Sequence, residues 1–168
     1  MKIHVRLPQT LLASIHADLS RPHPFAAERV GFLFCGSAAL SGEGLLLLGQ
    51  KWHVVDDRDY IDDRSVGACI GPGAFRDVLQ QVYRAPASIL HIHRHDHSGR
   101  PQFSRTDVKS MYEFVPGFFN ACRSHPHGAV VLSHDSAEGR IWLHSGSAGH
   151  TIGRYELIGT PMQRWSQS

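Results

Sequence analysis

Four histidines at alternate positions constrain this chain more than any other feature of its sequence. They are His91, His93, His95 and His97, within the stretch SILHIHRHDHSG. Successive side chains of a β-strand point to opposite faces, so a strand through this stretch would present these imidazoles on one side. Leu90 and Ile92 alternate with the first histidines and suit burial of the other face. A row of imidazoles on one face is typical of a metal site.

The end of the strand decides which histidines are held rigidly. A buried strand is predicted at residues 87–93, because beyond it Arg94 and Asp96 replace the apolar partners and a Ser-Gly-Arg-Pro stretch indicates a loop. A catalytic zinc ion takes three protein ligands and leaves a fourth position for water. We therefore predict His91 and His93 as the rigidly presented pair of ligands, with His95 as the reserve candidate.

A carboxylate for the third ligand position follows shortly afterwards. A helix is predicted at residues 104–114, and Asp107 lies in its first turn, three residues after Ser104. We predict Asp107 as the third metal ligand. The same Ser-x-x-Asp spacing is close to a capping box, which serves only to start a helix, and this alternative stays open. A second His-x-His, at His125 and His127, has no acidic residue at a comparable helix start and precedes its predicted strand rather than ending it, so we do not expect it to form the metal site.

Length and composition limit the class of protein. The 168 residues are 42% apolar and 19% charged with a net charge of +2, which suits a single domain, residues 1–168, with a hydrophobic core. No block of Lys and Arg is interleaved with aromatic residues, so nucleic acid is a weak candidate partner. The longest apolar run, at residues 44–49, is too short to span a bilayer. Because the N-terminus also lacks the pattern of a signal peptide, we expect a cytoplasmic location and no membrane partner.

Cysteine usage agrees with that location. The chain has three cysteines, Cys35, Cys69 and Cys122, and no Cys-x-x-Cys pair. An odd, widely spaced set argues against a disulfide framework and against a cysteine-based zinc site. We expect these residues to be small buried side chains in a reducing compartment.

Hydrophobic periodicity predicts helices interspersed with strands. Helices are predicted at residues 8–19, 71–83 and 104–114, and strands at residues 2–6, 28–36, 44–55, 87–93, 128–133, 140–144 and 151–158. The first strand is predicted to lie at a sheet edge, and the tail at residues 162–168 to be frayed or docked at the surface. This pattern indicates an α/β fold.

Five positions together resemble the JAB/JAMM zinc metalloprotease family, also called MPN domains. The family pattern is a Glu at the start of an apolar strand, a His-x-His at a strand end and a Ser-x-x-Asp at a helix start. The matching residues are Glu28, His91, His93, Ser104 and Asp107. The predicted elements also follow that family's order over nearly the whole chain. The resemblance implies a single MPN (cytidine-deaminase-like) domain with a central mixed, largely antiparallel curved sheet flanked by helices.

Two features depart from the family pattern. The family usually has Ser, Thr or Asn between its histidines and Pro after them, where this chain has Ile92 and Arg94. Its usual gap from the second His to the Ser is seven residues, whereas ten residues separate His93 from Ser104. Extra loop residues add little to the entropy of loop closure. Taking His93 and His95 as the pair shortens the gap to eight, so His95 stays in reserve.

The resemblance implies hydrolysis of an amide bond at a bound Zn²⁺ ion. Zinc would lower the pKa of a bound water toward neutrality, Glu28 would act as general base, and Ser104 would hydrogen-bond the developing oxyanion. The family commonly cleaves the peptide or isopeptide bond after the C-terminal Gly-Gly of ubiquitin or a ubiquitin-like protein. This short chain is similar to stand-alone bacterial members, which implies a ubiquitin-like modifier protein and its conjugates as partners, in deconjugation or precursor processing.

Two other functions stay open from the sequence. One is a non-catalytic MPN scaffold that only binds partners, although a scaffold does not need the complete set of five residues. The other is a zinc hydrolase acting on a small amide or a sulfur-carrier adduct. The histidines at 95 and 97 are expected to lie in a plain solvated loop, but they also permit a second or inhibitory metal ion, or a mobile flap over the site.

Overall fold

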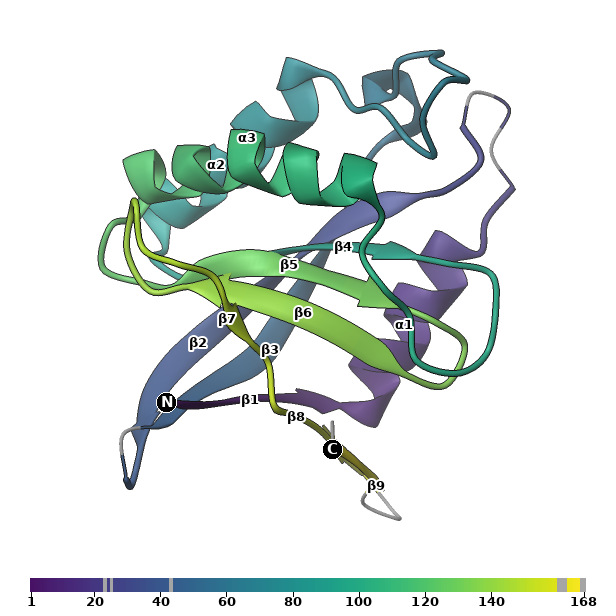
Figure 1. Ribbon diagram of the computed structural model, residues 1–168. Helices are drawn as coiled ribbons and strands as arrows, with labels where there is room; N and C mark the ends of the chain where they lie inside the picture. Colours follow the sequence, from purple (N-terminus) through teal and green to yellow (C-terminus); the bar gives the residue numbers. More distant parts are fainter. Residues whose placement is uncertain (23, 25, 43, 160–162, 167–168) are drawn as a thin grey trace.

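The computed structural model describes residues 1–22, 24, 26–42, 44–159 and 163–166. Within them, nine strands form one mixed sheet that is accompanied by three α-helices and a 3-10 helix (Figure 1). In chain order the elements are β1 (Lys2–Pro8), α1 (Gln9–Leu19), β2 (Val30–Leu40), β3 (Gly44–Val54), η1 (Asp57–Asp59), α2 (Pro72–Arg84), β4 (Ser88–Arg94), α3 (Arg105–Ala121), β5 (His127–Leu132), β6 (Ala137–Trp142), β7 (His150–Thr151), β8 (Arg154–Ile158) and β9 (Gln163–Ser166). The predicted mixed α/β class is confirmed.

The strand order across the sheet is β7-β6-β5-β4-β2-β3-β1-β8-β9. The pairs β1–β3, β1–β8 and β4–β5 are parallel, and the other neighbouring pairs are antiparallel. The sheet curls, so that β8 and β9 lie below β5 and β6 (Figure 1). The histidine-bearing strand β4 lies inside the sheet between β2 and β5, and its backbone is therefore held on both sides.

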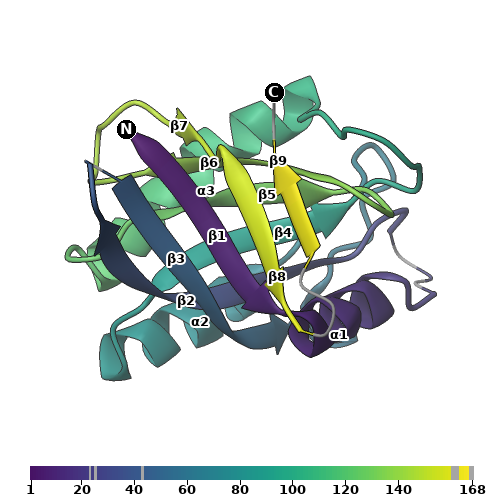
Figure 2. The ribbon, with the colours of Figure 1, turned by 90° about the horizontal axis from the view of Figure 1, so that it is seen from below.

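Two apolar cores occupy the two faces of the sheet. One lies inside the curl and includes α1, and the other lies under α2 and α3 (Figures 1 and 2). The alternation along β4 divides its residues between them: Leu90 and Ile92 belong to the core inside the curl, and Ile89 to the core under the helices. His91 lies on the helix side, because its ring centroid is 4.6 Å from that of Phe114 in α3. The predicted alternation along this strand is confirmed.

The sequence pattern predicted that the first strand lies at a sheet edge, but the structure places it inside the sheet. β1 pairs in parallel with β3 on one side and with β8 on the other. Its alternating apolar side chains, Ile3, Val5 and Leu7, are at most 5% exposed. The prediction was wrong because β8, from near the C-terminal end of the chain, returns to cover the free side of β1. Local periodicity carries no information on that long-range pairing.

The third helix continues well beyond its predicted end at residue 114. It ends at Ala121 and contains Pro116, a residue that usually ends or kinks a helix because it lacks an N–H donor. The apolar side chains on both sides of the proline recur at helical spacing and are buried: Met111, Val115, Phe118 and Phe119. Their burial against the sheet opposes the break. None of the helices in the described parts of the chain is long and apolar enough to cross a membrane.

The strand predicted at residues 151–158 is divided into β7 and β8, which pair with different parts of the sheet. Between them, the Ile152 N–H donates to the Gly139 carbonyl at 3.0 Å and the Gly153 N–H to the Ile3 carbonyl at 2.9 Å. These two bonds link β6 to β1 across the curl. β6 also begins at Ala137, earlier than predicted, and residues 163–166 of the tail form β9; the rest of the tail lies outside the described residues.

His127, in the second His-x-His, serves the fold. His127 is fully buried at the start of β5. Its Nδ1 accepts a hydrogen bond from the Ile89 N–H at 3.0 Å, and its Nε2 donates to the Cys122 carbonyl at 2.7 Å. Burial lowers the pKa of His127 from 6.5 to about 4, although the bond to the Cys122 carbonyl opposes the shift. The neutral ring therefore joins β4 to the end of α3.

We expect protonation of His127 to destabilise the fold as the pH falls from 6.5 toward 4. The folded-state pKa lies below the unfolded value, so the unfolded chain binds the extra proton more readily and stability is lost on acidification. Between pH 8 and pH 5, the free energy of unfolding should fall by about 2 kcal/mol less in His127→Gln than in the wild type. Urea denaturation at both pH values measures the difference, and parallel pH profiles for the two proteins would contradict this assignment.

Candidate metal centre

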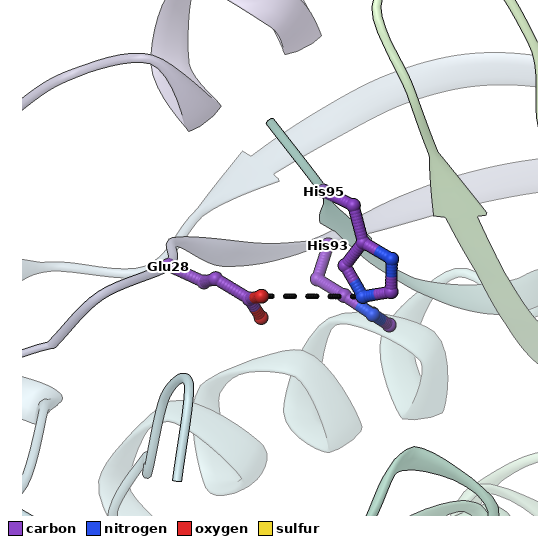
Figure 3. A group of neighbouring side chains, drawn as sticks. All are labelled: Glu28, His93 and His95. Carbon is purple, nitrogen blue, oxygen red and sulfur yellow. Dashed lines mark ion pairs between the residues drawn. The ribbon is translucent and has the colours of Figure 1, made fainter. Parts of the chain in front are cut away.

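The C-terminal end of β4 presents two imidazoles to the same space. β4 ends at Arg94, but the His95 N–H still donates to the Leu132 carbonyl of β5 at 2.9 Å. The backbone therefore follows β5 for one residue more, and the alternation of side chains extends to His95. The rings of His93 and His95 lie with their centroids 5.1 Å apart (Figure 3). The predicted change from strand to loop directly after His93 comes too early.

Glu28 reaches this pair through the antiparallel pairing of β2 with β4. Val30 lies opposite His93 in that register, and continuing the register by two residues sets Glu28 opposite His95. The Glu28 Oε1 lies 3.9 Å from the His95 Nε2 (Figure 3). The Glu28 N–H donates to the Gly67 carbonyl at 2.9 Å. A Cβ at residue 67 would lie 2.5 Å from the Glu28 Oε2, so only glycine leaves the carboxylate where it is.

The segment that carries Glu28 is fixed by the neighbouring Arg29. Its side chain is only 3% exposed. The guanidinium donates to the carbonyls of Arg21 and Pro22 at 2.8 and 2.9 Å and pairs with the Asp57 carboxylate at 2.7 Å. A buried arginine with these partners is strongly held in place. It anchors the chain before β2 from outside the candidate metal centre.

Asp107 is held by the start of α3. Its Oδ2 accepts a hydrogen bond from the Ser104 N–H at 2.7 Å, and its own N–H donates to the Ser104 Oγ at 3.1 Å. These two bonds are a complete capping box. The same Oδ2 lies 3.5 Å from the His93 Nε2 and 3.8 Å from the His95 Nε2. The Asp107 carboxylate thus has two roles. It caps the helix, as the alternative from the sequence had it, and it lies beside both imidazoles.

The spacing of these atoms suits a small tetrahedral cation. Ligand atoms of Glu28, His93 and His95 lie within 4.8 Å of one another, and Asp107 adds the contacts to both rings given above. Zinc bonds of about 2.0–2.1 Å to nitrogen and oxygen place neighbouring ligand atoms about 3.3 Å apart. Two neutral imidazoles and a carboxylate are a common catalytic zinc set. Asp107 lies within 4.0 Å of both histidines, whereas Glu28 lies that close only to His95. Asp107 is therefore the better third ligand.

The electrostatics of the site also favour a cation. The His93 side chain is 4% exposed, and its Nε2 has no hydrogen-bond partner among the described residues, because 3.5 Å to Asp107 is too long. A buried polar atom left in this way is costly. Burial alone would raise the pKa of Asp107, but His93 and the hydrogen bonds from Ser104 outweigh it and hold that pKa well below its usual range. An ionised carboxylate therefore faces a buried ring nitrogen that has no hydrogen-bond partner among the described residues.

His91, the other predicted ligand, lies outside this group. Its ring centroid is 6.2 Å from that of His93 and packs against Phe32 and Phe114, at 5.4 and 4.6 Å. Burial, with a smaller contribution from His93, lowers the pKa of His91 to about 3, so its ring is neutral. Toward its N-terminal end, β4 runs under α3, and the histidine there is covered by aromatic side chains. The geometry thus favours the reserve pair, His93 and His95, over His91 and His93.

The remaining predicted site residues have distinct positions. Ser104 lines the same cavity as the four grouped side chains, and because its Oγ accepts from the Asp107 N–H, its hydroxyl hydrogen is free to donate. His97 is exposed, with its Nδ1 2.9 Å from the Ser98 carbonyl oxygen. Sequence reasoning missed the contributions of Gly67 and Arg29, which gave no motif signal. The only cue to Gly67 was a glycine within an otherwise unassigned loop.

Comparisons with known proteins identify no family. No protein-family model matches the sequence, and no curated protein matches it. Among solved structures, the N-terminal domain of STIL from Trichoplax adhaerens is similar at 10% sequence identity with a TM-score of 0.39. The match covers 79% of this chain and 38% of that one, so this chain spans well under half of that neighbour's length. A likeness this weak carries no argument about function.

Zinc titration of single variants distinguishes the two possible histidine pairs. We expect His95→Ala to lower the affinity for Zn²⁺ by roughly 100-fold or more, because it removes a ligand. His91→Leu and the exposed control His97→Ala should bind zinc like the wild type. Competition with a chromophoric chelator measures all four proteins. Loss of zinc binding in His91→Leu with retention in His95→Ala would instead support the pair His91 and His93.

Proposed function

We propose that this chain is a zinc-dependent peptidase or isopeptidase of the JAB/JAMM type, built on a single MPN domain. The observation that carries the proposal is the meeting of Glu28, His93, His95 and Asp107 around a buried imidazole nitrogen that has no hydrogen-bond partner in the described part of the chain. These residues fit a zinc ion by atom type, by spacing and by charge. A structural cluster would satisfy the His93 Nε2 within the protein, as the fold does for both ring nitrogens of His127.

The side chains divide the work of amide hydrolysis among them. His93, His95 and Asp107 would hold the ion. A zinc ion there would supply a Lewis acid for the amide carbonyl and lower the pKa of water in the site. Glu28 takes a proton from the attacking water and delivers it to the leaving amine. Ser104 donates its hydroxyl hydrogen to the developing oxyanion, a contact that is most valuable in the transition state. Arg29 and Gly67 hold the Glu28 carboxylate in reach of the reaction.

The substrate in this proposal is a ubiquitin-like modifier, cleaved after its C-terminal Gly-Gly. The support is the match of Glu28, His93, His95, Ser104 and Asp107 to the JAB/JAMM pattern, with the shorter gap of eight residues between the second histidine and the serine. An extended tail with two glycines can approach a metal closely because no side chain intervenes. The three free cysteines agree with a cytoplasmic location.

Replacing the general base while keeping the ligands tests this proposal. We expect Glu28→Gln to bind one zinc ion per chain, as the wild type does, and to lose about 10²–10⁴-fold in kcat on a modifier fusion that continues past Gly-Gly. Glu138→Gln, whose side chain pairs with Arg100 outside the cavity, is the matched control and should retain activity. Zinc content is measured by atomic emission and cleavage by electrophoresis. Unchanged turnover in Glu28→Gln would remove Glu28 from the reaction.

A further inference from the structure

The cavity at the metal centre is much larger than the cluster of ligands. Its volume is about 640 Å³, and it includes Glu28, His93, His95 and Asp107. Beyond them it is lined by large apolar side chains from the loop before α2, from α2 and from α3: Ile70, Phe75, Leu79, Met111, Phe114 and Phe118. Phe114 contacts His91, which precedes His93 and His95 along β4. The apolar wall therefore lies on the N-terminal side of the cluster along that strand. One continuous space thus has a polar, metal-binding part and an apolar part.

We propose that the apolar part of this cavity receives one large apolar side chain of the substrate, on the leaving-group side of the scissile bond. The inference rests on the proposed amide hydrolysis and adds a specificity to it. Cavities of 300–1,000 Å³ with apolar and aromatic walls and few polar groups are typical binding sites for small groups. Along the wall, the ring centroid of Phe114 lies 6.1 Å from that of Phe75 and 5.5 Å from that of Phe118. This spacing suits contact with another aromatic ring.

The position of Glu28 determines the side of the scissile bond. Two glycines on the acyl side have no side chain to fill an apolar cavity. The proton from Glu28 goes to the leaving amine, so the leaving group must lie near this carboxylate. Gly67 contacts Glu28, and the chain continues from there through Ile70 into α2, which supplies Phe75 and Leu79 to the wall. The apolar wall is therefore continuous with the side from which the amine departs.

His91 gives this part of the cavity a polar group. It lines the cavity, and within the described residues neither of its ring nitrogens has a hydrogen-bond partner. The ring is half-buried rather than fully buried, so a molecule in the cavity can reach it. A bound residue could supply a hydrogen-bond partner through its backbone or a polar side-chain tip. The imidazole that the sequence suggested as a metal ligand thus becomes a contact for the substrate.

Gly117 offers a way to fill the cavity without disturbing the fold. It lies in α3 and lines the cavity, and a Cβ built on it meets nothing within 4 Å. Gly117→Phe should occupy the space that we assign to the substrate side chain. Gly117→Ala leaves that space open and is the matched control, since both substitutions replace glycine in the same helix.

The test uses the zinc-loaded wild type and these two variants on four quenched fluorescent peptides. The peptides are identical except for the residue after Gly-Gly, which is Gly, Asp, Leu or Phe. We expect kcat/KM to be at least about tenfold higher for Leu and Phe than for Gly and Asp in the wild type and in Gly117→Ala. In Gly117→Phe the preference should disappear while the Gly peptide is still cleaved. Cleavage without a preference, or a preference that survives Gly117→Phe, overturns the inference and leaves the proposed hydrolysis in place.

A binding measurement decides the inference even if no peptide is cleaved. Isothermal titration of the same three proteins with phenylalaninamide, and with glycinamide as control, probes the cavity with the amine product alone. We expect phenylalaninamide to bind at least about tenfold more tightly than glycinamide, and to lose this advantage in Gly117→Phe. Equal affinities for the two amides would refute the apolar site. Absence of cleavage together with this selective binding would refute only the proposed hydrolysis.

Discussion

The antiparallel pairing of β2 with β4 is the constraint on which the rest of the site depends. Its register sets Val30 opposite His93, and by continuation Glu28 opposite His95. On the other side of β4, the bond from the His95 N–H to the Leu132 carbonyl keeps the strand alternation intact past its last paired residue. A slip of one residue would send the imidazoles to the opposite face of the sheet. The chemistry of the cluster is thus determined by backbone hydrogen bonds on both sides of one interior strand.

The start of α3 completes the cluster at little additional cost, because the capping box that begins the helix also orients the Asp107 carboxylate toward the two rings. The His93 Nε2, in contrast, is buried without a hydrogen-bond partner among the described residues. A buried polar atom without a partner costs about 1–3 kcal/mol, and sites that break a folding rule in this way are often functional. A cation shared with Asp107 would remove that penalty, so this unsatisfied nitrogen is also the strongest indication of a ligand at the site.

Strong local patterns could be predicted from the sequence, and long-range contacts could not. The alternation along β4 and the helix start at Ser104 follow from residue spacing. The approach of Glu28 to the histidines and Asp107 is a long-range contact, and it was expected only from the JAB/JAMM resemblance. The choice of His95 over His91 depends on a bond to β5, which lies more than thirty residues further along the chain. The interior position of β1 depends in the same way on β8. Pro116 misled the helix prediction because burial of Phe118 and its neighbours outweighs the local signal.

X-ray absorption at the zinc edge, on the full chain loaded with one equivalent of Zn²⁺, tests the central claim most directly. We expect only nitrogen and oxygen neighbours at about 2.0–2.1 Å, with the multiple-scattering pattern of two imidazoles. In His95→Ala that pattern should fall to one imidazole, while in His91→Leu it should remain at two. A sulfur neighbour at about 2.3 Å, for which Cys69 in the cavity wall is the available source, or a pattern unchanged in His95→Ala, would contradict the proposed centre.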